Sequence, residues 1–316
     1  MMASSDGLRP SVDVGVVTWN TRDLTVEALQ RLLSVDQGVD LRLLVHDNAS
    51  TDGTAEAVEA AVPSADVEVS ASNLGFAAGV NRLLARSTAP WFLALNSDAW
   101  PVGGAIGALV AAAERHPRAA AVAPRLERPD GSLEHSTHPF PSVPVALASA
   151  AGLRGPWAER HALHGAWAHD RERPVDWAVG AALLMRRTAL DAVGGFDDSF
   201  FMYAEDLEWC HRARAAGWEI WFTPGACVVH VGNASGEQRY GAARAARVWA
   251  NTYRFYRRHH GAVSTGGYRA ANAIGAMRGA ARGVVRRDRG LARFWWQQVP
   301  VHVRGGVRHT DMDGSA

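Results

Sequence analysis

The first hundred residues alternate short apolar runs with segments in which apolar side chains recur at helical spacing. Apolar runs at 12–19, 41–45, 67–70 and 91–95 predict four buried strands. Between the first two runs, Val26, Leu29, Leu32 and Leu33 follow the spacing of one helix face. Strands that alternate with helices predict an α/β fold, in which helices flank a mostly parallel central sheet.

Acids and amides follow three of these strands. Asp47 ends the second run, Asn73 follows the third, and Asp98 follows the fourth. Each residue alone would suit an Asx turn or a helix cap. Right-handed crossovers, however, place the carboxyl ends of parallel strands on one edge of the sheet, so the three side chains are expected to converge. We therefore predict a ligand site at this edge, with Asp98 positioned to bind a metal ion.

Further strands are predicted after residue 118. Residues 119–123 and 179–185 are apolar enough for buried strands, and Pro129-Asp130-Gly131 predicts a hairpin turn. The stretch 137–173 has no steady period and is predicted to be an excursion over the ligand edge. Thr188 is expected to cap a short helix.

Two candidate sites lie beyond this region. Leu207, Cys210 and Ala213 recur at helical spacing, which places Glu205 and Asp206 in the first turn of a helix. Acids are common in a first turn because the helix dipole favours them there. Residues 218–222 and 226–231 predict two more strands, and His230 lies near the end of the second.

Charge divides the chain into two parts. Residues 240–316 carry fourteen arginines and three acids, a net charge of +11, whereas residues 1–239 carry −10, and the chain has no lysine. We therefore predict one domain over 1–239 and a helical, arginine-rich extension over 240–316. Such a segment indicates an anionic partner, either lipid headgroups or nucleic acid.

Within the extension, one helix face combines charged and polar residues, which is usual for a solvated surface; its members are Arg247, Asn251, Arg254 and Arg258. Further on, arginines lie beside Phe294, Trp295 and Trp296, a combination that favours a membrane interface.

Cysteine content and hydropathy bear on location. Cys210 and Cys227 offer no paired framework, which favours reduced thiols and the cytosol. The first ten residues lack the apolar core of a signal peptide. The longest apolar stretches, 102–113 and 143–153, are shorter than the ~20 residues of a membrane-spanning helix. We expect a cytoplasmic protein, with any membrane contact being peripheral and on the inner face of the cell membrane.

The order of motifs resembles the family 2 glycosyltransferases of GT-A fold, especially their rhamnosyltransferase-like branch. Seven segments between residues 12 and 260 carry the resemblance; they are Val16-Val17-Thr18-Trp19-Asn20, His46-Asp47-Asn48-Ala49-Ser50-Thr51-Asp52-Gly53, Asn73-Leu74-Gly75-Phe76-Ala77-Ala78-Gly79-Val80-Asn81, Leu95-Asn96-Ser97-Asp98, Gly194-Gly195-Phe196-Asp197, Tyr203-Ala204-Glu205-Asp206 and His230-Val231-Gly232. The resemblance makes residues 1–239 the nucleotide-sugar-binding and catalytic domain. It implies an inverting enzyme that moves a sugar, such as rhamnose, from a nucleotide-sugar donor to a saccharide.

The resemblance also implies roles for individual residues. Asp98 matches the last acid of the family's DxD motif, and with His230 it would bind a divalent metal, Mg²⁺ or Mn²⁺. Asn96 replaces the first acid of that motif, so the site has one negative charge fewer. Asp206 matches the catalytic base, and Glu205 would orient that base or cap the helix. The residues implied to line the donor site are Thr18, Asn20, Asp47, Asn73 and Asn96.

Partners and alternatives follow from these roles. The donor would be dTDP-rhamnose or a UDP-sugar, and the acceptor a saccharide or polyprenyl-linked saccharide used in cell-wall or polysaccharide assembly. A sugar-1-phosphate nucleotidyltransferase is an alternative, but Thr18-Trp19-Asn20 stands where those enzymes carry a glycine-rich, basic loop. A nucleic-acid-binding protein is a second alternative. It would have no use for Asp47, Asp98 and Asp206, and we expect no nucleic acid as a partner.

Overall fold

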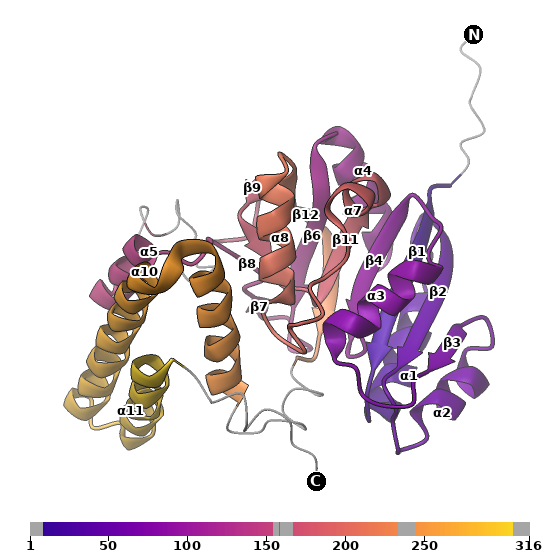
Figure 1. Ribbon diagram of the computed structural model, residues 1–316. Helices are drawn as coiled ribbons and strands as arrows, with labels where there is room; N and C mark the ends of the chain where they lie inside the picture. The colour runs from indigo at the N-terminus through magenta and orange to yellow at the C-terminus, as the bar shows by residue number, and fades with distance from the viewer. Residues whose placement is uncertain (1–8, 154–157, 159–166, 233–243, 306–316) are drawn as a thin grey trace. The chain divides into compact units, whose positions relative to one another are not determined.

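The computed structural model describes residues 9–153, 158, 167–232 and 244–305 (Figure 1). The chain divides into two compact units, of which the first comprises 1–138 with 168–235 and the second 139–167 with 236–316. The excursion predicted over 137–173 thus contributes to both units. The boundary predicted between residues 239 and 240 lies outside the described residues and stays a prediction.

The first unit is built on a ten-stranded mixed sheet of order β3-β2-β1-β4-β11-β6-β12-β5, with β7 paired to β6 and β9 to β12. The predicted strands β1 to β4 are parallel neighbours, and β6 is parallel to β12. The antiparallel β11 lies between β4 and β6. The bounds are β1 Ser11–Thr18, β2 Asp40–Asp47, β3 Asp66–Val69, β4 Trp91–Asn96, β5 Ala99–Pro101, β6 Ala119–Glu127, β7 Leu133–Glu134, β9 Arg173–Val175, β11 Ala182–Arg186 and β12 Glu219–His230.

Helices cover both faces of this sheet (Figure 1). Val12, Val14 and Val16 of β1 join one buried core with Leu29 of the helix α1 and Leu109 of the helix α4. On the other face α3 packs against β1 and β2, and α7 and α8 pack against later strands. The α/β architecture is thereby confirmed. The helix bounds are α1 Arg22–Leu33, α2 Thr54–Ala61, α3 Phe76–Arg86, α4 Ala105–Arg115, α7 Arg187–Val193 and α8 Glu205–Ala215.

Close packing explains a glycine in the middle of the buried strand β1. A Cβ at Gly15 would overlap the ring of Phe92 on the neighbouring β4, and it would also contact Leu83 of α3. Glycine weakens a strand interior, but here it leaves space for a large aromatic side chain.

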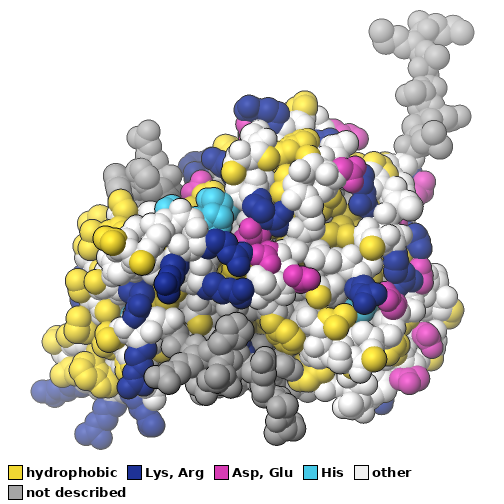
Figure 2. All heavy atoms as spheres, in the orientation of Figure 1, with side chains coloured by type: hydrophobic (Ala, Val, Ile, Leu, Met, Phe, Trp, Pro, Cys, Tyr) yellow, Lys and Arg dark blue, Asp and Glu magenta, His cyan; other side chains and the backbone are white. Residues whose placement is uncertain are grey.

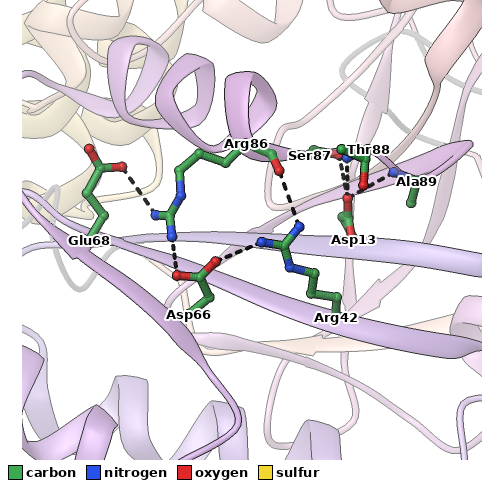
Figure 3. A network of polar contacts seen from close by, with 8 residues as sticks. All are labelled: Asp13, Arg42, Asp66, Glu68, Arg86, Ser87, Thr88 and Ala89. Atoms are coloured by element: carbon green, nitrogen blue, oxygen red, sulfur yellow. Dashed lines mark hydrogen bonds and ion pairs between the residues drawn. The ribbon is translucent and has the colours of Figure 1, made fainter.

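The amino-terminal ends of β1 and β4 are joined by a buried acid (Figure 3). Asp13 accepts hydrogen bonds from the Ser87 hydroxyl and from the backbone amides of Thr88 and Ala89, at 2.8–3.0 Å. Beside it, Asp66 of β3 pairs with both Arg42 and Arg86. These contacts lie at the edge opposite to the predicted ligand site, so they hold the strands without occupying that site.

Two local predictions were wrong. The segments 218–222 and 226–231 form one strand, β12, with a register irregularity between Thr223 and Cys227. Pro224 and Gly225 lie in that irregularity, where a missing ladder bond is tolerated, so the strand continues. Thr188 lies inside α7 rather than before it, and no side chain caps that helix.

A two-stranded ribbon completes the described part of the first unit. It pairs β8 (Thr137–His138) with β10 (Trp177–Ala178) in antiparallel register.

The second unit is helical in its described part. It contains α5 (Val143–Ala151), the long α10 (Arg244–Val285), which is interrupted at Gly261, and α11 (Arg289–Arg304). An aromatic cluster forms its core, in which the Tyr253 hydroxyl lies 2.8 Å from Nδ1 of His302. Arg247 and Asn251, predicted to be solvated, are buried. None of the helices that the structure describes is both long and apolar enough to cross a bilayer.

Candidate functional site

The register of three parallel strands brings predicted site residues side by side. Thr18, the last residue of β1, is paired with Asp47, the last residue of β2. On its other side β1 pairs with β4, where Val17 is opposite Asn96. Thr18, Asp47 and Asn96 therefore lie at the same end of three adjacent strands, the end at which Asp47 and Asp98 were predicted.

The loops after β1 and β2 are held together by hydrogen bonds. The buried Asp47 carboxylate accepts a 2.7 Å hydrogen bond from the backbone amide of Ser50. The amide of Asn20 donates to the Ser50 hydroxyl at 2.8 Å, and the Asn20 side-chain oxygen accepts from the amide of Thr51 at 2.7 Å. Thr18 is buried against the hydroxyls of Thr21 and Thr25. These hydrogen bonds fix the two loops to each other and so hold the side chains at this edge in place.

Asn73 lies in the loop between β3 and α3. Its side-chain oxygen accepts a hydrogen bond from the amide of Gly75, which forms an Asx turn. Asn48 ties this loop to β2, since its side chain donates to the carbonyl of Gly75 and accepts from the amide of Leu74. Asn48 directly follows Asp47 in the chain and was not among the predicted site residues.

Asp98 and His230 meet where β4 ends and β12 ends. Oδ1 of Asp98 lies 3.3 Å from Nε2 of His230, and both side chains are buried. The side-chain nitrogen of Asn96 lies 3.2 Å from the same Nε2. The other ring nitrogen, Nδ1, lies 2.9 Å from a carboxylate oxygen of Glu134 on β7. Burial lowers the His230 pKa, but hydrogen bonds and charge from the two carboxylates outweigh it and raise the pKa to about 9.

Glu134 was not found from the sequence. It follows a hairpin turn, where an acid is ordinarily a surface residue, so no sequence signal set it apart. The hairpin of β6 and β7 nevertheless brings it to His230, 96 residues away in the chain. A carboxylate on one imidazole nitrogen fixes the ring and the tautomer that the other nitrogen presents, an arrangement common around metal-binding histidines.

These side chains fit a metal ion only in part. Among the described residues, no three His, Cys, Asp or Glu side chains form a group that could hold a metal. The protein offers Asp98 Oδ1 and His230 Nε2 close together. A Mg²⁺ ion is commonly held by one or two carboxylates together with substrate phosphates. The arrangement thus suits a metal whose coordination is completed by a diphosphate.

Glu205 and Asp206 begin α8, and both are buried. Asp206 accepts hydrogen bonds from the amides of Gly180 at 2.9 Å and Leu207 at 2.7 Å. Burial raises the Asp206 pKa although these bonds favour the carboxylate. Burial and the adjacent Asp206 charge raise the Glu205 pKa well above its ordinary value, and Oε2 of Glu205 has no hydrogen-bond partner.

Gly180 connects this pair to the metal-site residues. Its amide donates to Asp206, and the carbonyl of the next residue, Ala181, accepts from the amide of Asn96 at 2.9 Å. Asp206 is therefore anchored at the end of β4, beside the Asp98 segment. The isolated glycine in the apolar run 178–185 was the available sequence signal for such a close approach.

The backbone before Asp206 is strained. Tyr203 and Ala204 have φ values of 72° and 71°, in the left-handed region that non-glycine residues rarely adopt. The carbonyl of Phe201, just upstream, accepts a 2.8 Å hydrogen bond from the amide of Phe76 at the start of α3. Strain of this kind is found where the surrounding structure holds a side chain in place for function.

Comparison with protein families decides the family. The model of glycosyl transferase family 2 matches residues 13–192, more than half of the chain, and that of glycosyl transferase family 21 matches residues 165–282. The chain belongs to glycosyl transferase family 2. The resemblance to this family is thereby confirmed.

Curated relatives of this family 2 chain include rhamnosyltransferases. The N-acetylglucosaminyl-diphospho-decaprenol L-rhamnosyltransferase of Mycobacterium tuberculosis is 36% identical over 203 residues, which are 60% of this chain. The match spans 66% of that relative's length, just under two thirds. The rhamnosyltransferase WbbL of Escherichia coli is 38% identical over 56 residues, 18% of this chain and 21% of the relative.

Solved structures share the fold at low identity. The mannosyltransferase PcManGT from Pyrobaculum calidifontis, in complex with GDP-Man and Mn²⁺, has a TM-score of 0.56 and 18% identity, covering 94% of this chain and 85% of its own. GalNAc-T7 with UDP, GalNAc and Mn²⁺ has a TM-score of 0.59 and 12% identity, covering 90% and 54%. The predicted GT-A fold is thereby confirmed.

Proposed function

We propose that this protein is an inverting glycosyltransferase that moves a sugar from a nucleotide-sugar donor to a lipid-linked saccharide in cell-wall or polysaccharide assembly. The observation that carries the proposal is the anchoring of Asp206, through Gly180 and Ala181, beside the strand that ends at Asn96. The buried Asp206 carboxylate thus lies at the edge where β2 ends at Asp47 and where Asp98 follows β4. Family membership favours sugar transfer over the nucleotidyltransferase and nucleic-acid-binding alternatives.

The donor is proposed to bind across the ends of β1, β2 and β4. Asp47 and Thr18, with Asn20 and Asn73 in the adjoining loops, would contact the nucleoside, and Asn96 would lie toward the diphosphate. We propose dTDP-rhamnose as the donor, because two of the curated relatives are rhamnosyltransferases. A UDP-sugar is the alternative to be tested.

Asp98 and His230 are proposed to hold a divalent metal, Mg²⁺ or Mn²⁺, together with the donor's diphosphate. Two solved structures of this fold contain Mn²⁺, which supports the choice. Such an ion would neutralise negative charge on the departing diphosphate. Glu134 would keep Nε2 of His230 directed toward that charge.

Asp206 is proposed to be the catalytic base. Its carboxylate would take the proton from the acceptor hydroxyl as that oxygen bonds to the anomeric carbon and the bond from that carbon to the diphosphate oxygen breaks. One displacement of this kind inverts the anomeric configuration. Burial and the adjacent Asp206 charge raise the Glu205 pKa, which favours the protonated form of Glu205 beside a charged Asp206.

The acceptor and the location are proposed from the relatives. A relative whose name specifies a diphospho-decaprenol acceptor supports a polyprenyl-linked saccharide. The enzyme would then work in the cytoplasm, at the inner face of the cell membrane.

A screen of nucleotide sugars tests the proposal. The purified protein is heated with dTDP-rhamnose, UDP-sugars or GDP-mannose, each with Mn²⁺, with Mg²⁺ and with chelator, and release of nucleotide diphosphate is measured in parallel. At a donor concentration of about 100 times Kd, binding should add roughly 2.7 kcal/mol to the free energy of unfolding. We expect one donor to raise the melting temperature only when metal is present. No shift and no nucleotide release with any donor would refute the proposal.

A further inference from the structure

An apolar stripe runs along the second half of α10. Ala270, Ile274, Met277, Ala281 and Val284 are all exposed, and their spacing of three and four places them on one helix face. Ile274 is 50% exposed, Met277 45% and Val284 70%. Single exposed apolar residues are ordinary, whereas a continuous exposed stripe indicates a surface that binds something.

The stripe is not the face of α10 that packs against α11 or α5. A Cβ at Gly279 would meet the ring of Trp295 on α11, and one at Gly283 would meet Ala292, so α11 lies against these two glycines. Successive residues of a helix are 100° apart, which places Gly279 and Gly283 on the side of α10 opposite to the stripe. The packing on α5 also uses another position, Gly275, which lies against Ala150. Neither neighbouring helix covers the stripe. Figure 2 shows hydrophobic side chains gathered over these helices.

Arginines surround the end of the stripe where α10 turns into α11. Arg286, Arg287, Arg289 and Arg293 are exposed. Asp288 is the one acid in this stretch, and its side chain is used to cap α11 by accepting from the amide of Leu291 at 2.9 Å. The end of this helical hairpin is therefore strongly positive.

The paired tryptophans divide between core and surface. Trp295 packs on α10, while Trp296 is 65% exposed and Phe294 is 51% exposed. α11 lies on the side of α10 away from the stripe, so these two exposed rings are not part of the stripe surface.

We infer that the second half of α10 lies on an anionic lipid bilayer, with the Ile274–Met277–Val284 stripe in the headgroup region and the arginines at the turn into α11 on lipid phosphates. The inference rests on the proposed function, in which the acceptor is lipid-linked, and names the surface that meets the membrane. Charge argues against a parallel contact with a second copy of the chain. A twofold contact with the two helices parallel would bring two arginine clusters together, with one capping acid on each side, and an antiparallel contact would show in the mass measured below.

Vesicle co-sedimentation of the full-length protein tests this inference. Vesicles of phosphatidylcholine alone are compared with vesicles that also contain phosphatidylglycerol, at low and high salt. The first variant, I274S/M277S/V284S, removes the stripe, and the second, R286Q/R287Q/R289Q, removes charge. The matched control, L33S/V69S/V102S, removes three apolar side chains of similar exposure (43%, 58% and 46%) from the first unit. Thermal melting verifies that every variant is folded, and light scattering gives its mass.

We expect the wild type and the control to bind vesicles that contain phosphatidylglycerol, and less so at high salt. One arginine near an anionic surface strengthens binding roughly fivefold, so the arginine variant should bind roughly 100-fold more weakly. The stripe variant should bind these vesicles roughly tenfold more weakly or worse than the wild type. The inference is overturned if wild type stays in the supernatant at low salt, or if the stripe variant binds like the control. It is equally overturned if the wild type is a dimer and the stripe variant is a monomer, because a second copy then covers the stripe.

Release of nucleotide diphosphate with a water-soluble acceptor, measured without vesicles, separates this inference from the proposed function. A stripe variant that keeps this activity but loses vesicle binding supports both. Vesicle binding by a wild-type protein that shows no transfer would leave the membrane surface supported and the function refuted.

Discussion

Replacement of Asp206 by Asn is the sharpest test of the site. The change keeps the shape of the side chain and removes its ability to accept a proton. Asp206 now accepts hydrogen bonds from two backbone amides, those of Gly180 and Leu207. An asparagine has one oxygen, so one of these amides loses its acceptor, at a cost of about 1–3 kcal/mol. Removal of a buried charge offsets that cost, because burial already raises the Asp206 pKa. The protein should therefore fold.

The kinetic effect should be far larger than the structural one. Loss of a general base lowers rates by roughly 10²–10⁴-fold, which corresponds to about 3–5 kcal/mol of transition-state stabilisation. The contacts of Asp47 and Thr18 with their own loops are unchanged, so donor affinity should stay within about threefold of wild type. The pH profile of the wild-type enzyme supplies a second readout. Its rate should fall, as pH is lowered, through a pKa above the usual range of aspartate, because burial raises the Asp206 pKa.

Glu205→Gln is the matched control, since it removes an acid from the adjacent residue. The folded-state pKa of Glu205 is raised above its ordinary 4.5, so stability is lost as pH rises from that value toward the folded pKa. Glutamine is neutral at every pH and should raise the melting temperature at neutral pH while changing the rate less than tenfold.

Transfer rates and donor affinity are measured for both variants by nucleotide release and isothermal titration. Wild-type turnover in Asp206→Asn would refute the assignment of the base. An equal loss in Glu205→Gln would show that the pair, and not Asp206 alone, carries the reaction.

Three further predictions concern the metal site and the helical unit. For Asp98→Ala, we expect the thermal stabilisation by donor to become independent of Mn²⁺; an unchanged metal dependence would remove Asp98 from the site. For Glu134→Gln, Mn²⁺ affinity in the presence of nucleotide diphosphate should fall roughly 10–100-fold, because the ring of His230 loses its charged partner; calorimetry showing wild-type affinity would contradict this. Burial lowers the pKa of His302 from 6.5 to about 4, so up to about 3 kcal/mol of stability should be lost as pH falls through that window. His302→Gln should flatten this part of the melting-temperature profile, and an unchanged slope would refute the assignment.

The candidate site was largely predictable because its polar residues follow strands directly. Apolar runs end at Asp47 and shortly before Asp98, and parallel pairing necessarily brings such positions together. The roles given to these residues stay predictions until the variants are measured. Glu134 could not be found in the same way, since no pattern distinguishes it from a surface acid, and Gly180 gave only the general signal of an isolated glycine in an apolar run.

The sequence by itself determined the α/β class, the shared edge for Asp47, Asn73 and Asp98, and the positive charge of the carboxyl-terminal segment. These follow from periodicity and composition, which are local properties of the chain. Only the tertiary structure decided that β11 is antiparallel between β4 and β6, that Glu134 contacts His230, and that Trp295 is packed while Trp296 is exposed. Those outcomes depend on contacts between residues far apart in the chain or on which helix face a neighbour covers, and no local pattern contains that information.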